Sequence, residues 1–317
     1  MTDGRPRPTR ALLRGAGLLA LIALTCLGGC GRAILQPEGP VEYSERTILF
    51  DALVIMLGIV IPTMVAIVIF AWHFRASNTR ATYRPDWSYS GRLELINWSI
   101  PILVVMFLGG IAWVASHTLD PAAPIKSENK PLEIDIVALD WKWLFIYPEN
   151  GIATVNEMYV PVNVPLNMRI TSATVLNVFF VPELGSMIYS MYGMRSRLNL
   201  MADRTGDFFG LSAMINGDGF PDMHFDVHAV TPEQFAEWAT RTRGAGGATL
   251  DDRSYRELLV QTMNVKPYSY ASVQPGLFDA IVLQKFPPGD GPKPKVPGLS
   301  AALPGSSAPS LASTSAR

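Results

Sequence analysis

Two long stretches of the chain are apolar and carry no charge. Residues 52–72 and 95–116 contain no Asp, Glu, Lys or Arg. A helix rises about 1.5 Å per residue, so each stretch can cross a hydrocarbon core of about 30 Å. We therefore predict a transmembrane hairpin with helices over about residues 48–73 and 93–117. Pro62 and Pro101 lie inside these stretches. Because prolines are tolerated where neighbouring helices satisfy the freed carbonyl groups, both spans are expected to pack against further membrane helices.

Beyond Pro124 the pattern changes to short segments in which apolar and polar residues alternate. Alternation with a period of two is typical of half-buried strands, and turn residues separate the segments. We predict strands over residues 132–139, 141–147, 155–160, 167–171, 175–181, 196–201, 208–214 and 224–230. This many short strands within residues 121–230 indicate a small β-sandwich or barrel.

From residue 231 onward the chain changes to helical segments and then to a low-complexity tail. Thr231 followed by Pro232 is typical of a helix start. Two more short helices are predicted over about residues 252–261 and 275–285, so residues 231–286 form a C-terminal helical extension. Residues 287–317 are rich in Pro, Gly, Ser and Ala. Such a segment buries too little apolar surface to fold, so we predict a disordered tail.

The N-terminus has the pattern of an export signal. Four arginines precede an apolar stretch over residues 18–27, which is too short to span a bilayer stably. The stretch ends in Leu27-Gly28-Gly29-Cys30, which resembles a bacterial lipobox. Residues 1–29 are then a lipoprotein signal peptide, and residues 30–120 comprise a lipid-anchored N-terminus and the two spans. A plain signal peptide with incidental cysteines remains the alternative. If Cys30 carries lipid and Cys26 leaves with the signal, the mature chain has no free thiol.

Arginine placement predicts the orientation of the hairpin. The loop over residues 74–92 carries four arginines against one Asp, whereas the segment before the first span carries three Glu against Arg32 and Arg46. Cytoplasmic loops are enriched in Lys and Arg. We therefore expect a bacterial inner-membrane protein with a cytoplasmic loop and with the N-terminus and the C-terminal domain in the periplasm.

Composition excludes several classes of function. The 26 Lys and Arg residues balance 27 Asp and Glu residues, which argues against a nucleic-acid binder. The chain has two cysteines, Cys26 and Cys30, and both lie in the N-terminal region. A disulfide scaffold, a cysteine zinc site and an iron–sulfur cluster in the folded domain are therefore excluded.

Three motifs in the strand region resemble subunit II of the heme-copper oxidases, whose outer domain is a cupredoxin fold. They are Asp140-Trp141-Lys142-Trp143, the segment Asn-Val-Phe-Phe-Val-Pro over residues 177–182, and Gly-Asp-Phe-Phe-Gly over residues 206–210. The segments over residues 146–149, 151–157, 70–72 and 75–78 are similar to the cytochrome bo-type ubiquinol oxidase branch. The resemblance implies a membrane protein with a transmembrane hairpin, a periplasmic cupredoxin-like β-sandwich and short C-terminal helices.

The same resemblance implies a noncatalytic subunit of a proton-pumping ubiquinol oxidase. Quinol oxidation, hemes b and o, one copper and oxygen reduction would belong to subunit I, and further small membrane subunits would be partners. This chain would brace subunit I and cap its periplasmic side. No cytochrome c is expected as a partner. Two alternatives remain open: a cytochrome c oxidase subunit II that transfers electrons through copper, and a stand-alone periplasmic ligand-binding lipoprotein.

The ligand positions of the family's CuA centre separate the two oxidase branches. That two-copper centre uses two cysteines, two histidines, a methionine and a glutamate carbonyl. The resemblance places Asn177 and Phe220 at the histidine positions, Ser212 and Asn216 at the cysteine positions, Met214 at the glutamate position and Met223 at the methionine position. Bridging thiolates are indispensable to the centre, and Ser and Asn do not replace them. We therefore predict a cupredoxin-like domain that binds no metal. In copper-binding relatives, the tryptophan matching Trp141 lies on the surface and accepts electrons.

Glu94 and two histidines are the remaining candidate site residues. Glu94 starts the second span, where an acid favours the helix dipole. It also matches the family acid at the cytoplasmic entrance of the K pathway, so proton uptake is the functional alternative. His224 and His228 have a spacing that suits a metal on a helix. In a predicted strand they would lie about 13 Å apart, which argues against a shared metal site.

Overall fold

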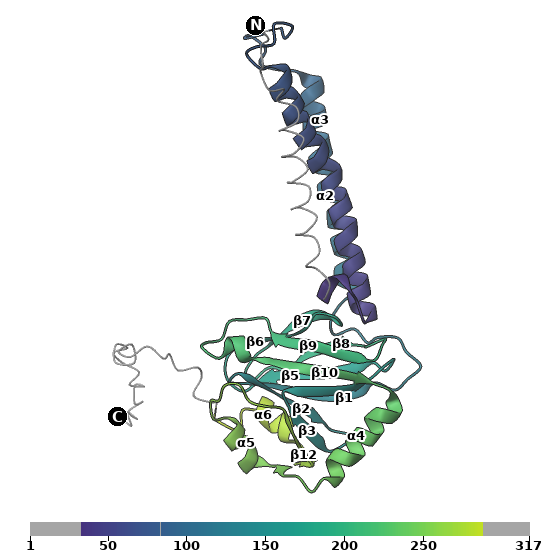
Figure 1. The fold of residues 1–317 in the computed structure, drawn as a ribbon, viewed down its shortest axis with the longest axis vertical. Coiled ribbons are helices and arrows are strands. Elements are labelled where there is room, and N and C mark those ends of the chain that lie inside the picture. The colour runs from purple at the N-terminus through teal and green to yellow at the C-terminus, as the bar shows by residue number, and fades with distance from the viewer. Residues whose placement is uncertain (1–32, 83, 288–317) are drawn as a thin grey trace, which may run out of the picture.

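The computed structural model describes residues 33–82 and 84–287. Two long helices stand side by side on one end of a β-sandwich (Figure 1). They are α2 (Pro40–His73) and α3 (Gly91–Thr118), and the short 3-10 turn η2 (Ala33–Leu35) precedes them. The apolar window of each helix is unburied within the chain. The signal peptide, Cys26, Cys30 and nearly all of the predicted tail lie outside the described residues.

The helix α2 begins earlier than the span predicted over residues 48–73. Its first turn packs on the strand β7 (Gly185–Ser190). A Cβ on Gly39 would lie 2.3 Å from the Met201 carbonyl oxygen, and a Cβ on Gly185 would lie 2.7 Å from the Val41 side chain. Because only glycine allows these approaches, α2 packs directly on the sandwich. The first helix and the sandwich are thereby in direct contact.

Two sheets form the sandwich. The first has six strands in the order β12-β3-β2-β1-β5-β8, and the second has five in the order β4-β10-β9-β6-β7. Their bounds are β1 Leu132–Leu139, β2 Lys142–Tyr147, β3 Ile152–Val155, β4 Glu157–Pro161, β5 Leu166–Ser172, β6 Asn177–Val181, β8 Ser196–Leu200, β9 Gly206–Ser212, β10 His224–Val230 and β12 Tyr268–Tyr270. A separate pair joins β11 (Thr249–Leu250) to β13 (Ser272–Val273).

An aromatic core fills the space between the two sheets. Phe225 on β10 packs against Trp143 at 5.7 Å and Phe145 at 5.0 Å on β2, and stacks on Phe179 of β6 at 5.2 Å between ring centroids. All four rings are at most 1% exposed. The alternation that predicted strands therefore places one face of each sheet in a single shared core.

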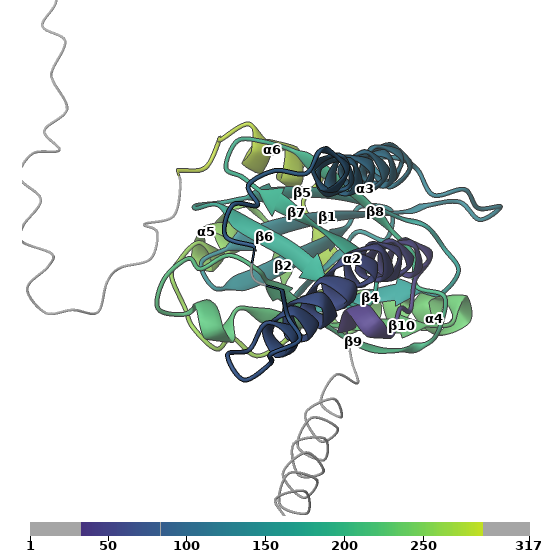
Figure 2. The same ribbon diagram turned by 90° about the horizontal axis from the view of Figure 1, so that it is seen from above.

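A second core lies on the outer face of the six-stranded sheet and involves the C-terminal extension. It contains Leu144, Tyr255, Leu258, Phe278 and Phe286. The extension comprises α4 (Pro232–Gly244), α5 (Asp252–Leu258) and α6 (Leu277–Val282). Seen from above, α4 lies on a different side of the sandwich from α5 and α6 (Figure 2). The predicted fold class is confirmed: two long apolar helices, a β-sandwich and short C-terminal helices.

The predicted strands differ from the structure in several places, and those over residues 167–171, 175–181, 196–201 and 208–214 shift by one or two residues at an end. The predicted strand over residues 155–160 is two strands, because Asn156 adopts a left-handed backbone with φ of 57° and breaks the segment. The predicted strand over residues 141–147 starts one residue later, since Trp141 also has a positive φ of 58°. The edge strand β7 was not predicted; its exposed residues give it a weak alternation.

Candidate functional site

Four of the six positions that match the family's copper ligands converge in the structure. Asn177 opens β6 and Ser212 closes β9, and these two strands are paired. Asn216 and Met223 lie in the connection from β9 to β10, which includes the turn η3 (Phe220–Asp222). The four residues are between 0% and 9% exposed. The sheet therefore brings together side chains that are up to 46 positions apart in the sequence.

Hydrogen bonds between neutral groups hold this cluster, which we call the Asn177 cluster (Asn177, Ser212, Asn216, Met223). The Asn216 amide Nδ2 donates to Asn177 Oδ1 at 2.5 Å and to Met223 Sδ at 3.0 Å. Ser212 Oγ donates to Asn177 Oδ1 at 3.5 Å. N–H and O–H groups therefore point at Asn177 Oδ1 and Met223 Sδ, two atoms that would have to donate electron pairs to a metal.

The donor set of the Asn177 cluster does not fit a two-copper centre. Asn216 Oδ1 is buried without a hydrogen-bond partner among the described residues. A single neutral amide oxygen is a hard ligand, and Met223 supplies one weak thioether. The copper-bridging thiolates have no counterpart here, because Ser212 and Asn216 occupy both positions. The arrangement is suited to packing a buried turn through hydrogen bonds.

Met214 and Phe220 contribute no side chain to the cluster. Met214 is 36% exposed, although its carbonyl oxygen accepts from Ser212 Oγ at 3.5 Å. Phe220 is partly exposed in η3. Of the matched positions, the structure thus assembles four side chains and the backbone of a fifth.

Trp141 is buried beside the Asn177 cluster. Its side chain is 4% exposed, and a Cβ on Gly219 would lie 2.2 Å from its indole ring. The connection that carries Asn216 therefore approaches this indole closely at Gly219. A tryptophan covered in this way packs the domain.

The histidines of β10 do not share a site. His228 Nδ1 lies 2.6 Å from Asp207 Oδ1, whereas His224 stacks on Phe209 with ring centroids 5.5 Å apart. Within residues 33–82 and 84–287, no group of three or more His, Cys, Asp or Glu side chains is placed to hold a metal.

Glu94 lies in the first turn of α3, at the end of the hairpin far from the sandwich (Figure 1). Its backbone N–H donates to the Ser90 carbonyl oxygen at 2.9 Å, and its side chain is exposed. The acid therefore stands where the helix dipole favours a negative charge.

Buried charges tie the C-terminal extension to the sandwich, and the sequence did not reveal them. Lys142 is 2% exposed, and its Nζ donates to the Val260 carbonyl oxygen at 2.8 Å and to Thr262 Oγ1 at 2.6 Å. Burial lowers the pKa of Lys142 to about 8. The sequence signal for this buried charge was a lysine placed between two tryptophans in a predicted strand. Its partners, more than 115 residues away, were not readable from the pattern.

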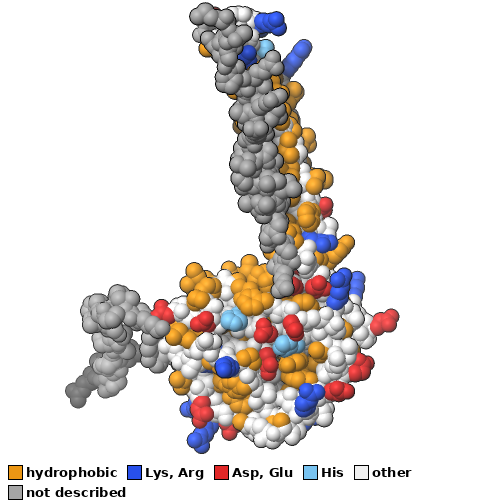
Figure 3. Space-filling view, in the orientation of Figure 1, with side chains coloured by type: hydrophobic (Ala, Val, Ile, Leu, Met, Phe, Trp, Pro, Cys, Tyr) orange, Lys and Arg blue, Asp and Glu red, His pale blue; other side chains and the backbone are white. Residues whose placement is uncertain are grey.

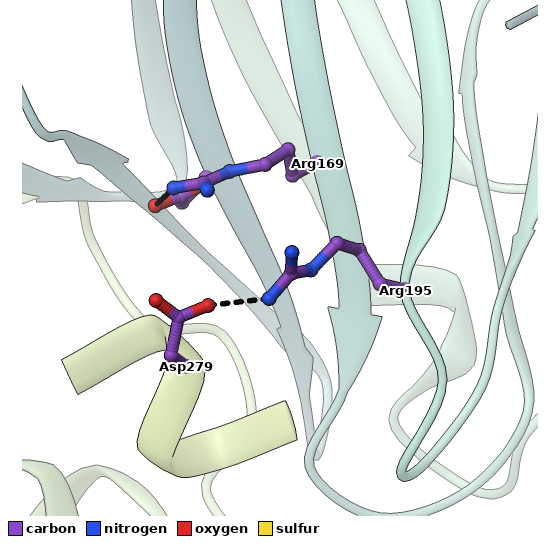
Figure 4. A network of polar contacts seen from close by, with 4 residues as sticks. Arg169, Arg195 and Asp279 are labelled. Carbon is purple, nitrogen blue, oxygen red and sulfur yellow. Dashed lines mark hydrogen bonds and ion pairs between the residues drawn. The ribbon is translucent and has the colours of Figure 1, made fainter. Parts of the chain in front are cut away.

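A second tie is the charged network in Figure 4. Arg169 donates to both carboxylate oxygens of the buried Asp135, at 2.5 Å and 2.6 Å. Arg195 pairs with Asp279 of α6, and both guanidinium groups lie over the Phe278 ring. Burial raises the pKa of Asp135, and the Arg169 guanidinium opposes that shift. The network fixes α6 on the six-stranded sheet.

Comparison with known families defines the class of protein. The family model of the periplasmic domain of cytochrome c oxidase subunit II matches residues 132–230. The model of the COX aromatic-rich motif matches residues 245–289, which include α5 and α6. With its two candidate spans, the chain is a membrane protein with a cupredoxin-like domain of the heme-copper oxidase subunit II class.

Individual relatives narrow the class to the quinol-oxidising branch. Cytochrome bo(3) ubiquinol oxidase subunit 2 of Pseudomonas aeruginosa is 45% identical over 272 residues, which cover 86% of this chain and 82% of that protein. Ubiquinol oxidase subunit 2 of Acetobacter aceti is 44% identical over 275 residues, covering 86% and 89%. The solved periplasmic domain of cytochrome oxidase subunit II of Bradyrhizobium japonicum is 26% identical, covers 37% of this chain and 94% of that chain, and has a TM-score of 0.34.

This chain belongs to the family of subunit 2 of the ubiquinol oxidases. It is a subunit of a ubiquinol oxidase complex of the respiratory chain. The resemblance to the bo-type branch drawn from the motifs is confirmed. Membership in this branch also excludes the alternative of a stand-alone periplasmic lipoprotein, because a subunit 2 implies other oxidase subunits.

Proposed function

We propose that this chain is a noncatalytic, copper-free subunit II of a proton-pumping ubiquinol oxidase. Quinol oxidation and oxygen reduction would take place in subunit I, which would hold hemes b and o and one copper. The observation that carries the proposal is the Asn177 cluster, whose neutral, mutually hydrogen-bonded groups replace the thiolates that a two-copper centre requires. Without that centre the domain offers no acceptor for electrons from cytochrome c.

The structural role that we propose follows from the two spans and from the packing of α2 on β7. The apolar windows of α2 and α3 are unburied within the chain, so helices of subunit I and of small membrane subunits would cover them. The seat of α2 on β7 would hold the sandwich as a cap over the periplasmic side of subunit I. The arginines of residues 74–92 support a cytoplasmic loop, and lipid on Cys30 would anchor the N-terminus at the outer surface of the inner membrane.

Purification of the complex through this chain tests the proposal. We expect a large heme protein to co-purify, with one copper per complex measured by elemental analysis and with an optical spectrum of hemes b and o. Three coppers per complex would mean that this chain binds two of them. Recovery of the chain without heme would show that it works outside an oxidase.

Glu94 is proposed to admit protons to the K pathway from the cytoplasmic side. The substitution Glu94→Gln keeps the size of the side chain and removes the proton-accepting group, so we expect turnover to fall by roughly tenfold, about 1.4 kcal/mol of activation free energy. Asp86→Asn is the matched control, since Asp86 is an exposed acid in the same loop region. Oxygen consumption and proton uptake of reconstituted complexes are the measurements. Equal turnover in both variants would reduce Glu94 to a helix-start charge.

A further inference from the structure

A cavity lies at the end of the hairpin that is far from the sandwich. It has a volume of about 490 Å³, and its lining includes Arg75, Asn78, Thr82, Arg84 and Trp87. The space-filling view shows Lys and Arg side chains gathered at this end of the hairpin (Figure 3). Cavities of this size accommodate small ligands or headgroups.

The Arg75 side chain in this cavity is held in place. Its guanidinium lies over the Trp72 ring at 4.4 Å from the centroid. Its Nε donates to Ser77 Oγ at 3.0 Å and its Nη1 donates to the Trp72 carbonyl oxygen at 3.3 Å. Within the described ranges, neither Arg75 nor Arg84 forms an ion pair with a carboxylate. Both positive charges are therefore available to an anion.

Hydrogen bonds of Asn78 hold the loop backbone around these arginines. Its Nδ2 donates to the His73 carbonyl oxygen at 2.5 Å, and its Oδ1 accepts from the Arg80 backbone N–H at 3.2 Å. The Asn78 N–H donates to the Arg75 carbonyl oxygen at 2.9 Å. These bonds fold the loop back on the end of α2 and give one wall of the cavity a defined shape.

The surroundings of the cavity favour a lipid over a soluble anion. Trp72 and Trp87 are 71% and 60% exposed, as is typical of rings at a membrane interface. Guanidinium groups bind phosphate through paired hydrogen bonds, and anionic lipids are attracted to basic segments on the cytoplasmic face of a membrane. A zwitterionic headgroup also carries a positive charge. The loop of residues 74–92, which has four arginines against the single acid Asp86, would repel that charge.

We propose that Arg75, Arg84 and Trp87 form a binding site for the phosphate headgroup of one anionic phospholipid, such as phosphatidylglycerol, at the cytoplasmic surface. The proposal rests on the orientation given under the proposed function. The site would fix the depth of the hairpin in the membrane, because the phosphate would hold the loop at the level of the headgroups.

Native mass spectrometry of the purified oxidase complex tests this site. The complex is titrated with phosphatidylglycerol or with phosphatidylcholine of the same acyl chains. We expect one phosphatidylglycerol to be retained by the unaltered complex, and at least tenfold weaker retention after the double substitution Arg75→Gln and Arg84→Gln. Arg80→Gln is the control, since it removes one positive charge from the same loop outside the cavity lining, and it should retain the lipid.

Three outcomes of the titration would overturn the proposal. Equal loss in Arg80→Gln would show diffuse attraction to the charged loop instead of a built site. Equal retention of phosphatidylcholine would show that the acyl chains bind and the headgroup does not. Retention of inorganic phosphate by the complex, with no retention of phosphatidylglycerol, would assign the cavity to a soluble anion. The heme spectrum and subunit content of each variant report assembly independently.

A separate measurement checks the orientation on which the site depends. Asp86→Cys places a thiol in the loop of a chain whose own cysteines are Cys26 and Cys30. We expect an impermeant thiol reagent to label this variant above the unaltered chain only after the inner membrane is permeabilised. Labelling of intact spheroplasts would place the loop outside and would contradict the orientation, whatever the titration shows.

Discussion

A variant of this chain that regains the family's missing ligands is expected to bind about two copper ions. The substitutions are Asn177→His, Ser212→Cys, Met214→Glu, Asn216→Cys and Phe220→His. The reason is geometric: the paired strands β6 and β9 already bring the Asn177 cluster together, and Met223 is in place and buried. Copper content of the purified complex and the visible absorption of copper–thiolate bonds are the measurements. The unaltered chain should contribute no copper.

The control for this variant keeps Ser212 and carries the other four substitutions. One thiolate cannot form the double bridge, so we expect the two-copper absorption to be absent. An assembled complex that carries all five substitutions and still binds no copper would contradict the geometric reasoning. It would mean that the connection over residues 213–223, pressed against Trp141 by Gly219, has moved too far from the family's shape.

Raising the pH above 8 is expected to stabilise the water-facing domain through Lys142. In the folded chain the pKa of Lys142 is about 8, because burial disfavours its charge. An unfolded lysine has a pKa of about 10.4, so between these values the unfolded chain binds more protons. The free energy of unfolding should therefore rise by up to about 3 kcal/mol as the pH increases from 8 to 10.4, and this gain is lost as the pH falls through 8.

Lys142→Met should flatten this pH dependence, since methionine has no charge to remove. Pulse proteolysis of the complex in urea, followed on this chain, gives the free energy of unfolding at each pH. Lys130→Met is the matched control: the Lys130 side chain is 78% exposed, so its removal should leave the rise intact. A rise that persists in Lys142→Met would assign the pH dependence to other groups.

The sequence determined the parts of this protein that depend on local pattern. The length of two uncharged runs specified the spans, and alternation specified β1 to the residue. The rest of the fold depends on contacts between residues far apart in the sequence, and local patterns do not predict such contacts. Asn156 breaks a predicted strand because its Oδ1 accepts the Trp143 N–H and its Nδ2 donates to the Val265 carbonyl oxygen, at 2.8 Å each. Both partners are distant in sequence, so the break was not readable.

For the candidate site as well, the sequence determined one part and the tertiary structure determined the other. Residue identities alone showed that the thiolates are missing, since no cysteine follows Cys30. Only the tertiary structure decided that Asn177, Ser212, Asn216 and Met223 form hydrogen bonds with one another and that Trp141 is buried. It also decided that Lys142 and Arg195 bind the C-terminal extension to the sandwich. Hydrogen bonds and ion pairs of this kind depend on distances of about 3 Å, and pairing of strands far apart in the chain sets those distances.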